Sequence, residues 1–149
     1  MGTLADLQPH ARFDCVLYID VLEHIQCDQV ELRRAASHLT RPGGRLVILS
    51  PAHNFLFTPF DTAIGHYRRY NRRSLTAILP QGMVIEKLRY LDSVGFFASV
   101  ANRLLFRQSM PTSEQIRIWD RAMVPLSTWI DPALRYHLGK SILLVARLS

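Results

Sequence analysis

Residues 13–25 read FDCVLYIDVLEHI, and this stretch passes from an apolar run directly into ionisable side chains. The run at 15–19 is apolar, aromatic or β-branched, and Asp20, Glu23 and His24 follow it. A near-continuous apolar run of this length is typical of a strand buried on both faces in a parallel sheet. Open α/β sheets bind ligands at the carboxyl ends of their strands. We therefore look for chemistry first at these three ionisable residues.

Composition predicts one folded domain. The chain has 149 residues, of which 48% are hydrophobic and 20% charged, enough for a real core and unlike a disordered segment. Its formal net charge of +6 comes almost wholly from arginine. Arginine suits phosphate and carboxylate groups, although genome composition accounts for such a bias equally well. Two cysteines, Cys15 and Cys27, make no disulfide framework. With no signal-peptide pattern and no apolar run of membrane length, we expect a cytoplasmic protein.

A helix and a second strand are predicted after the opening stretch. Residues 28–39 predict a helix in which Asp28 and Glu31 form a capping box. Its expected apolar stripe consists of Val30, Leu32, Ala35 and Leu39. The sequence Pro-Gly-Gly at 42–44 ends this helix, and RLVILS at 45–50 predicts a second buried strand parallel to the first.

The remaining segments predict a long loop, two strands and a helical region. The loop at 51–73, PAHNFLFTPFDTAIGHYRRYNRR, is long enough to indicate a lid or binding loop. A short helix capped by Ser74 is expected at 75–79, and strands at 83–91 and 141–148. Between these strands we expect helices at 94–106 and at 114–123, the latter ended by Pro125, and a further short helix starting at Asp131-Pro132.

With this order of elements, the chain resembles the class I S-adenosylmethionine-dependent methyltransferases. The resemblance is greatest to a bacterial small-molecule branch that carries the motifs FDxVxxxDVLEH and LxxPGGRLVxxxP, found here at 13–24 and 39–51. It covers essentially the whole chain but only the C-terminal half of the family's domain. That domain has a seven-stranded sheet ordered 3-2-1-4-5-7-6, with its last strand antiparallel.

The resemblance implies an α/β fold, a partial Rossmann-like sheet with strands equivalent to 4-5-7-6. These strands are expected at 13–19, 45–50, 84–91 and 141–148, in a single partial domain (1–149) with a helical insert at 93–137. The family's first three strands have no counterpart, and no GxGxG occurs. The chain is expected to be a fragment, the product of a misassigned start codon or a truncated homologue. If it is a methyltransferase fragment, the reading frame upstream should encode a strand followed by GxGxG.

The resemblance also implies cofactor contacts for S-adenosylmethionine. Thr3 and Leu4 match the adenine edge, although the family often has Asp where Thr3 stands. The residues that match the family's contacts to the methionine part of the cofactor are Ile19, Asp20 and Val21. His24 and Glu23 are expected at the mouth of the cofactor pocket. Asp20 is expected to be functional because a desolvated carboxylate without a partner is costly. Glu23 and His24 can instead be end-of-strand caps for the next helix. No metal site is predicted.

The acceptor pocket is expected in the long loop, at His66, Tyr67, Arg68, Arg69 and Tyr70. His66, with Asp20, is the predicted catalytic residue, acting as the base for the acceptor proton; it can also be a loop anchor. The two arginines suit an anionic group on the acceptor or form a solvated charge run. The two tyrosines can be packing residues.

We therefore predict a methyltransferase for a small-molecule acceptor. The apolar insert beside a basic loop suits a lipid-like, anionic acceptor and contact with a membrane surface, unless these helices simply shield the sheet. The alternative is a non-catalytic truncated homologue that self-associates through the exposed strand edge at 13–19. Nucleic-acid binding has the least support, because a basic run alone lacks any recognition pattern.

Overall fold

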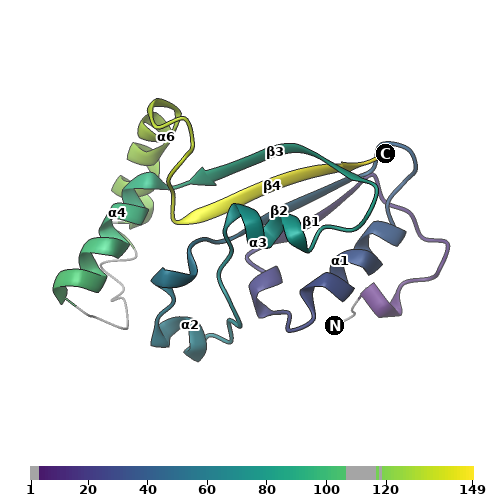
Figure 1. Ribbon diagram of the computed structural model, residues 1–149, viewed down its shortest axis with the longest axis horizontal. Helices are drawn as coiled ribbons and strands as arrows, with labels where there is room; N and C mark the ends of the chain where they lie inside the picture. Colours follow the sequence, from purple (N-terminus) through teal and green to yellow (C-terminus); the bar gives the residue numbers. More distant parts are fainter. Residues whose placement is uncertain (1–3, 107–116, 118) are drawn as a thin grey trace.

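The computed structural model describes residues 4–106, 117 and 119–149, which form an α/β unit around a four-stranded sheet (Figure 1). The strands are β1 (Cys15–Ile19), β2 (Arg45–Pro51), β3 (Met83–Leu91) and β4 (Ser141–Leu148). Their order is β1-β2-β4-β3. β1 and β2 are parallel, and β4 is antiparallel to both of its neighbours. The predicted partial sheet with an antiparallel last strand is confirmed.

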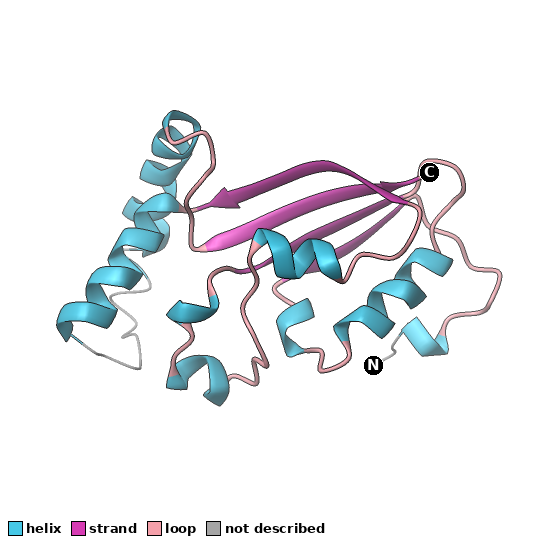
Figure 2. Cartoon of the chain, viewed as in Figure 1, coloured by secondary structure: helices cyan, strands magenta, loops and turns pink. Residues whose placement is uncertain are grey.

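One face of the sheet carries the core. Side chains alternate along β2 and β4, so that Leu46, Ile48 and Leu144 are fully buried. Helices α1 (Asp28–Ser37) and α3 (Arg72–Ala77) add Leu32 and Leu75 to the same cluster, and Figure 2 shows both helices along one side of the sheet. This amphipathic arrangement is what the alternating pattern of the strands predicts.

β1 differs from its prediction. Leu17 is 61% exposed and Ile19 46% exposed, whereas Tyr18 is buried. The prediction of a strand buried on both faces is wrong for this chain, because no helix of the described residues covers that face of β1 (Figure 2). β1 is also an edge strand. Cys15, expected to be buried, is exposed, and like Cys27 it forms no disulfide.

The helix caps also differ from the predictions. No side-chain cap precedes α1, which follows Cys27, so the capping box of Asp28 and Glu31 is wrong. Glu31 instead accepts a hydrogen bond from the Tyr18 hydroxyl. The predicted apolar stripe of α1 fails at Val30, which is 47% exposed. For α3 the cap is Asn71, whose side chain accepts from the Ser74 N–H, and the predicted cap Ser74 lies one turn inside the helix.

The long loop after β2 contains structure of its own. It forms a 3₁₀ turn, η3 (Asn54–Leu56), and helix α2 (Pro59–Ala63) before it reaches α3. The loop returns to the end of β2, where the Tyr70 N–H donates to the Pro51 carbonyl and the His53 N–H donates to the Tyr70 carbonyl. The loop is therefore hydrogen-bonded to the carboxyl end of the strand from which it departs.

Helices between β3 and β4 lie together at one end of the sheet (Figure 1). Helix α4 (Ser93–Ala101) continues as a π-helical stretch, Asn102–Phe106. A second π-helical stretch, Trp119–Met123, leads into α6 (Val124–Ala133). The predicted helix at 114–123 falls partly outside the described residues. Pro125 opens α6 and does not end a helix, and the Asp131-Pro132 pair lies inside α6 and starts no new one. Within the described residues, every helix is too short or too polar to cross a membrane.

Candidate functional site

Two segments meet beyond the carboxyl ends of β1 and β2. A 3₁₀ turn, η2 (Leu22–His24), follows β1, and the loop after β2 approaches it through His66 and Tyr67. The Tyr67 N–H donates to the Glu23 carbonyl over 2.8 Å. The rings of His24 and His66 pack edge to face with centroids 4.5 Å apart. The structure thus brings His66 to Glu23 and His24, which lie about 40 residues earlier in the sequence.

Asp61 anchors the loop beneath this cluster. Its carboxylate is 1% exposed and accepts two hydrogen bonds from the Arg69 guanidinium, at 2.8 and 2.9 Å. The backbone N–H and the hydroxyl of Thr58 donate to it as well, at 2.8 and 2.9 Å. Burial by itself raises the pKa of Asp61, but the hydrogen bonds from Arg69 and Thr58 outweigh it and lower the pKa to about 2. Asp61 is therefore ionised at neutral pH.

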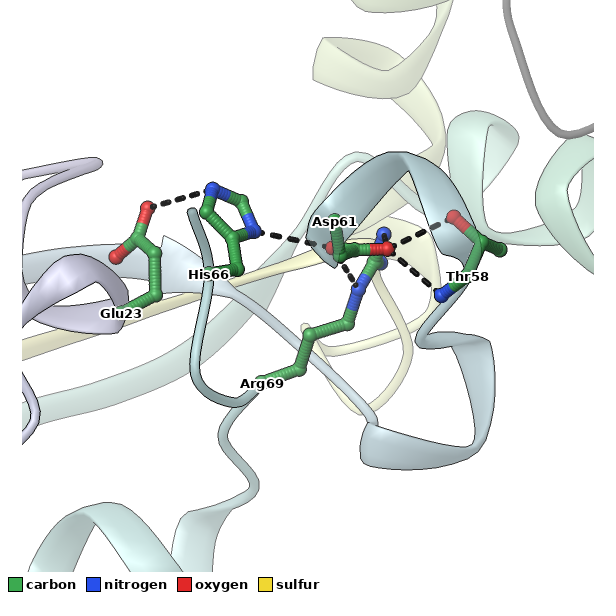
Figure 3. Close-up of polar contacts among 5 residues, drawn as sticks. All are labelled: Glu23, Thr58, Asp61, His66 and Arg69. Atoms are coloured by element: carbon green, nitrogen blue, oxygen red, sulfur yellow. Dashed lines mark hydrogen bonds and ion pairs between the residues drawn. The ribbon is translucent and has the colours of Figure 1, made fainter. Parts of the chain in front are cut away.

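His66 lies between two carboxylates (Figure 3). Its Nδ1 is 3.0 Å from Asp61 Oδ1, and its Nε2 is 3.9 Å from Glu23 Oε1. An ionised carboxylate can only accept, so Nδ1 carries the proton that Asp61 receives. In the neutral ring, Nε2 then carries a lone pair that faces Glu23.

Glu23 is the buried carboxylate of the strand end. It is 0% exposed, and within the described residues neither of its oxygens has a hydrogen-bond partner. Desolvation raises the pKa of Glu23. Smaller effects lower it, and they come from its own backbone N–H, from Ser50 and from the charge of His66. Ser50 lies near enough to exert this effect, but its hydroxyl forms no hydrogen bond with any other described residue. A buried carboxylate without donors is costly, so this group calls for an explanation.

Asp20 lies at the surface, so the expectation that its carboxylate is desolvated is wrong. Its φ of 50° places it in the left-handed region, and its N–H donates to the Leu49 carbonyl. The charge of Asp20 raises the pKa of both Glu23 and Lys140. For Lys140, burial is the largest effect and lowers the pKa to about 8, although the charge of Asp92 opposes it. The flanking Ile19 and Val21 are 46% and 43% exposed. Cofactor contacts at 19–21 stay a prediction.

Arg68 and Arg69 are engaged inside the protein. Arg68 contacts Asp28 over 2.6 Å and donates to the Gln26 carbonyl, while Arg69 pairs with Asp61 as described. The buried Tyr70 hydroxyl also donates to Asp28. Tyr67 is 54% exposed. Because both guanidinium groups pair with carboxylates, the interpretation as a solvated charge run is wrong, and anion binding by the two arginines stays a prediction.

Of the two residues expected at the adenine edge, Leu4 alone falls within the described residues. Thr3 is outside the described residues. Leu4 belongs to a 3₁₀ turn, η1 (Leu4–Asp6), which packs against α1. There it lines a surface pocket with Arg34 and His38, at the opposite end of α1 from Asp28. The structure does not bring Leu4 to His66.

Sequence reasoning singled out His24 and His66 but missed the pairing around them. Glu23 is predicted at the mouth of the cofactor pocket or as a cap, and Asp61 is not among the predicted site residues. The only local signal for Asp61 is the pattern Thr58-Pro-Phe-Asp61, which forms the capping box of α2. Nothing in the sequence indicates that a carboxylate after β1 lies next to a histidine in a later loop.

Comparison with known proteins identifies the fold. No protein-family model and no curated protein matches the chain. Among solved structures, an S-adenosylmethionine-dependent methyltransferase from Archaeoglobus fulgidus matches 97% of this chain and 62% of its own, with 17% identity and a TM-score of 0.56. YcgJ from Bacillus subtilis matches 99% and 69%, with 14% identity and a TM-score of 0.52.

The [4+2]-cyclase SpnF also matches, over 99% of this chain and 55% of its own, with 19% identity and a TM-score of 0.56. At these identities the likeness shows the fold alone: part of the Rossmann-like methyltransferase fold. The chain spans between about half and two thirds of the length of these proteins. Because the cyclase shares the fold, the fold by itself does not define the reaction.

Proposed function

We propose that the chain is the acceptor-side part of an S-adenosylmethionine-dependent methyltransferase for a small molecule. The observation that carries this proposal is the position of His66. It is held by an ionised carboxylate at the carboxyl ends of two parallel strands, where open α/β sheets bind ligands. The resemblance of the sequence motifs and the fold to methyltransferases supports methyl transfer as the reaction.

The strand end fits part of the cofactor. Ile19 and Val21 offer apolar surface on either side of the exposed Asp20, and these residues would hold the methionine part of S-adenosylmethionine, with His24 beside them. When bound, this cofactor supplies an activated methyl group. The sequence has no GxGxG, so these residues provide only part of the contacts that the resemblance implies.

His66 would receive the proton that the acceptor loses. Asp61 holds the Nδ1–H, so the imidazole keeps one orientation and presents Nε2 to the acceptor. The same carboxylate stabilises the imidazolium that forms. Positioning of the acceptor opposite the methyl group contributes much of the acceleration in such displacements.

The acceptor is proposed to be lipid-like. Phe97 in α4 is 53% exposed and Trp129 in α6 is 81% exposed, and both belong to the helical insert that follows β3. Exposed aromatic side chains suit an apolar ligand or surface. An anionic group on this acceptor would be bound by loop arginines, for which Arg68 and Arg69 are the sequence-based candidates.

Calorimetry with S-adenosylmethionine and S-adenosylhomocysteine tests the cofactor proposal. We expect micromolar binding that weakens at least tenfold in Asp20→Ala. Asp14→Ala, at the other end of β1 and also exposed, is the matched control and should bind normally. Absence of binding heat for both ligands, or equal affinity in Asp20→Ala, would contradict the proposal.

A second candidate function is self-association without catalysis. The observation that favours it is β1, an edge strand with exposed Leu17 and Ile19, because unprotected apolar edges pair with other chains. Light scattering should then show a dimer or larger species, and Leu17→Lys should reduce it. A monodisperse monomer, or micromolar binding of S-adenosylmethionine, would exclude this alternative.

A further inference from the structure

We propose that Glu23, His24 and His66 bind a divalent transition-metal cation of the Zn²⁺ class. One ligand atom from each of these residues lies within 4.8 Å of the others. Two imidazoles and one carboxylate form the donor set that zinc uses in catalytic sites, where a fourth position stays open. Imidazole ligands favour such metals over Mg²⁺ and Ca²⁺, which prefer oxygen donors.

His66 and Glu23 face each other with two acceptor atoms, so a cation could bind between them. Asp61 is paired with the Arg69 guanidinium and accepts from Nδ1, so the Nε2 lone pair of the neutral ring faces Glu23 Oε1 over 3.9 Å. Two acceptors facing each other at that distance gain nothing without a positive charge between them. A metal ion that accepts both lone pairs resolves the conflict.

Glu23 supplies an independent argument. Within the described residues both of its oxygens lack a hydrogen-bond partner although the side chain is 0% exposed. Desolvating a carboxylate in this way is costly unless a counter-charge or donors compensate. A cation bound to Oε1 provides that compensation, and metal ions are one of the accepted partners of buried charges.

His66 also has the outer contacts of a metal ligand. Histidines that bind metals almost always donate their other ring N–H to a carboxylate, carbonyl or water, which fixes the tautomer and the ring orientation. Asp61 has this position here, and Arg69 and Thr58 in turn hold Asp61. The chain of contacts therefore fixes the ring orientation and aims Nε2 at Glu23.

His24 provides both the third ligand and the access path. It is exposed, whereas Glu23 and His66 are largely covered. Gly65 comes close to it: a Cβ at Gly65 would lie 3.6 Å from His24 Nδ1. Ligands about 2.1 Å from one ion lie roughly 3.5 Å apart, so the cluster must contract by up to about 1 Å on binding. Rotation of the exposed His24 ring can supply that movement.

A bound metal would change how the acceptor is activated. Nε2 cannot hold a metal and accept a proton at the same time, so the metal replaces His66 as the activating group. An acceptor hydroxyl at the open position would lose its proton more easily, because a bound cation lowers the pKa of a coordinated oxygen. This step rests on the proposed methyl transfer, whereas metal binding itself does not.

Cobalt binding tests the site without any need for the substrate. Titration of the chelator-treated full chain with Co²⁺ should give one equivalent of visible d–d absorption, which Zn²⁺ displaces. Glu23→Gln, His24→Ala and His66→Asn should each abolish the absorption. His137→Ala removes an exposed histidine outside the cluster and should leave it unchanged. Asp61→Asn should weaken Zn²⁺ binding by about 10- to 100-fold.

Three outcomes would overturn the proposal. The first is the absence of d–d absorption in a chain whose circular dichroism shows it folded. The second is Co²⁺ binding that survives both Glu23→Gln and His24→Ala, which would place the ion elsewhere. The third is a proton in place of the metal, seen as an imidazolium signal from His66 by NMR at pH 8 that added Zn²⁺ does not change. Binding of S-adenosylmethionine is measured separately, so failure of the metal site and failure of the cofactor proposal are distinguishable.

Discussion

Asp61 and Glu23 flank the same imidazole, yet their surroundings are opposite (Figure 3). Asp61 accepts hydrogen bonds from Arg69 and Thr58, in addition to its contact with His66, and its pKa falls to about 2. Glu23 is as deeply buried but accepts no hydrogen bond from the described residues, and its pKa is raised. The two carboxylates are equally buried, but hydrogen-bond donors and a counter-charge offset the desolvation of Asp61, whereas none of the described residues donates a hydrogen bond to the Glu23 carboxylate.

We infer from this difference that Asp61 is a structural carboxylate and propose that Glu23 is a functional one. A group whose hydrogen-bonding capacity is already filled holds the loop in place and has nothing left for a ligand. A buried carboxylate that accepts no hydrogen bond lowers the stability of the free protein, and its oxygens remain available to bind a cation or a substrate. Matched substitutions of Asp61 and Glu23 should therefore have opposite effects on stability.

Asp61→Asn should cause the largest loss of stability. It leaves the buried Arg69 guanidinium, 9% exposed, without its counter-charge, and breaking a buried pair from one side typically costs about 3–5 kcal/mol. The free energy of unfolding in urea at pH 7 measures this loss. Adding Arg69→Met should recover part of it, because the orphaned charge is then removed. Unchanged stability in the single variant would contradict the structural assignment of Asp61.

The Asp61–Arg69 pair should also make the free energy of unfolding depend on pH in the acid range. The pKa of Asp61 falls from an ordinary 3.8 to about 2 on folding, so its contribution is present above about pH 4 and is lost as the pH falls towards 2. The lost contribution is about 2 kcal/mol. Asp61→Asn should lack this part of the acid dependence, whereas the exposed control Asp14→Asn should retain it.

Glu23→Gln should have the opposite sign. Because the pKa of Glu23 is raised on folding, the native state loses stability as the pH rises above the ordinary value of 4.5. The neutral amide removes this loss, so chelator-treated Glu23→Gln should be more stable than the wild type at pH 8 and equal to it below about pH 4. Destabilisation at pH 8 would indicate that Glu23 has partners in the free protein.

The positions of the strands could be predicted from patterns local to each strand, whereas their order in the sheet was implied by the resemblance of the motifs to the methyltransferases. The runs LVIL at 46–49 and ILLVA at 142–146 are continuously apolar, and the turn residues Gly44 and Gly139 precede them. The exposure of Leu17 could not be predicted, since an apolar residue has the same letter whether or not another element covers it. Burial on a sheet face depends on which other segments fold over it.

The histidines of the site could be predicted from the sequence, but their carboxylate partners could not, because those partners depend on how distant segments fold together. His24 and His66 attract notice as residue types, but the role of each depends on what faces it. Asp28 illustrates the point: its position before a helix indicated a cap, whereas Arg68 and Tyr70 from the later loop fill its carboxylate. Such pairings across about 40 residues are properties of topology, and no local spacing encodes them.

Thr58→Val should have the smallest effect and tests how far the anchoring of Asp61 extends. The substitution removes the hydroxyl donor at 2.9 Å but keeps the backbone donor at 2.8 Å, so a loss of about 1 kcal/mol is expected from the cap. Thr62→Val, exposed in the same helix, should change less. Because Arg69 still fixes Asp61, the His66 tautomer seen by ¹⁵N NMR should persist in Thr58→Val. A tautomer shift would mean that Thr58 also orients the imidazole and that the two carboxylates are less independent than their contacts indicate.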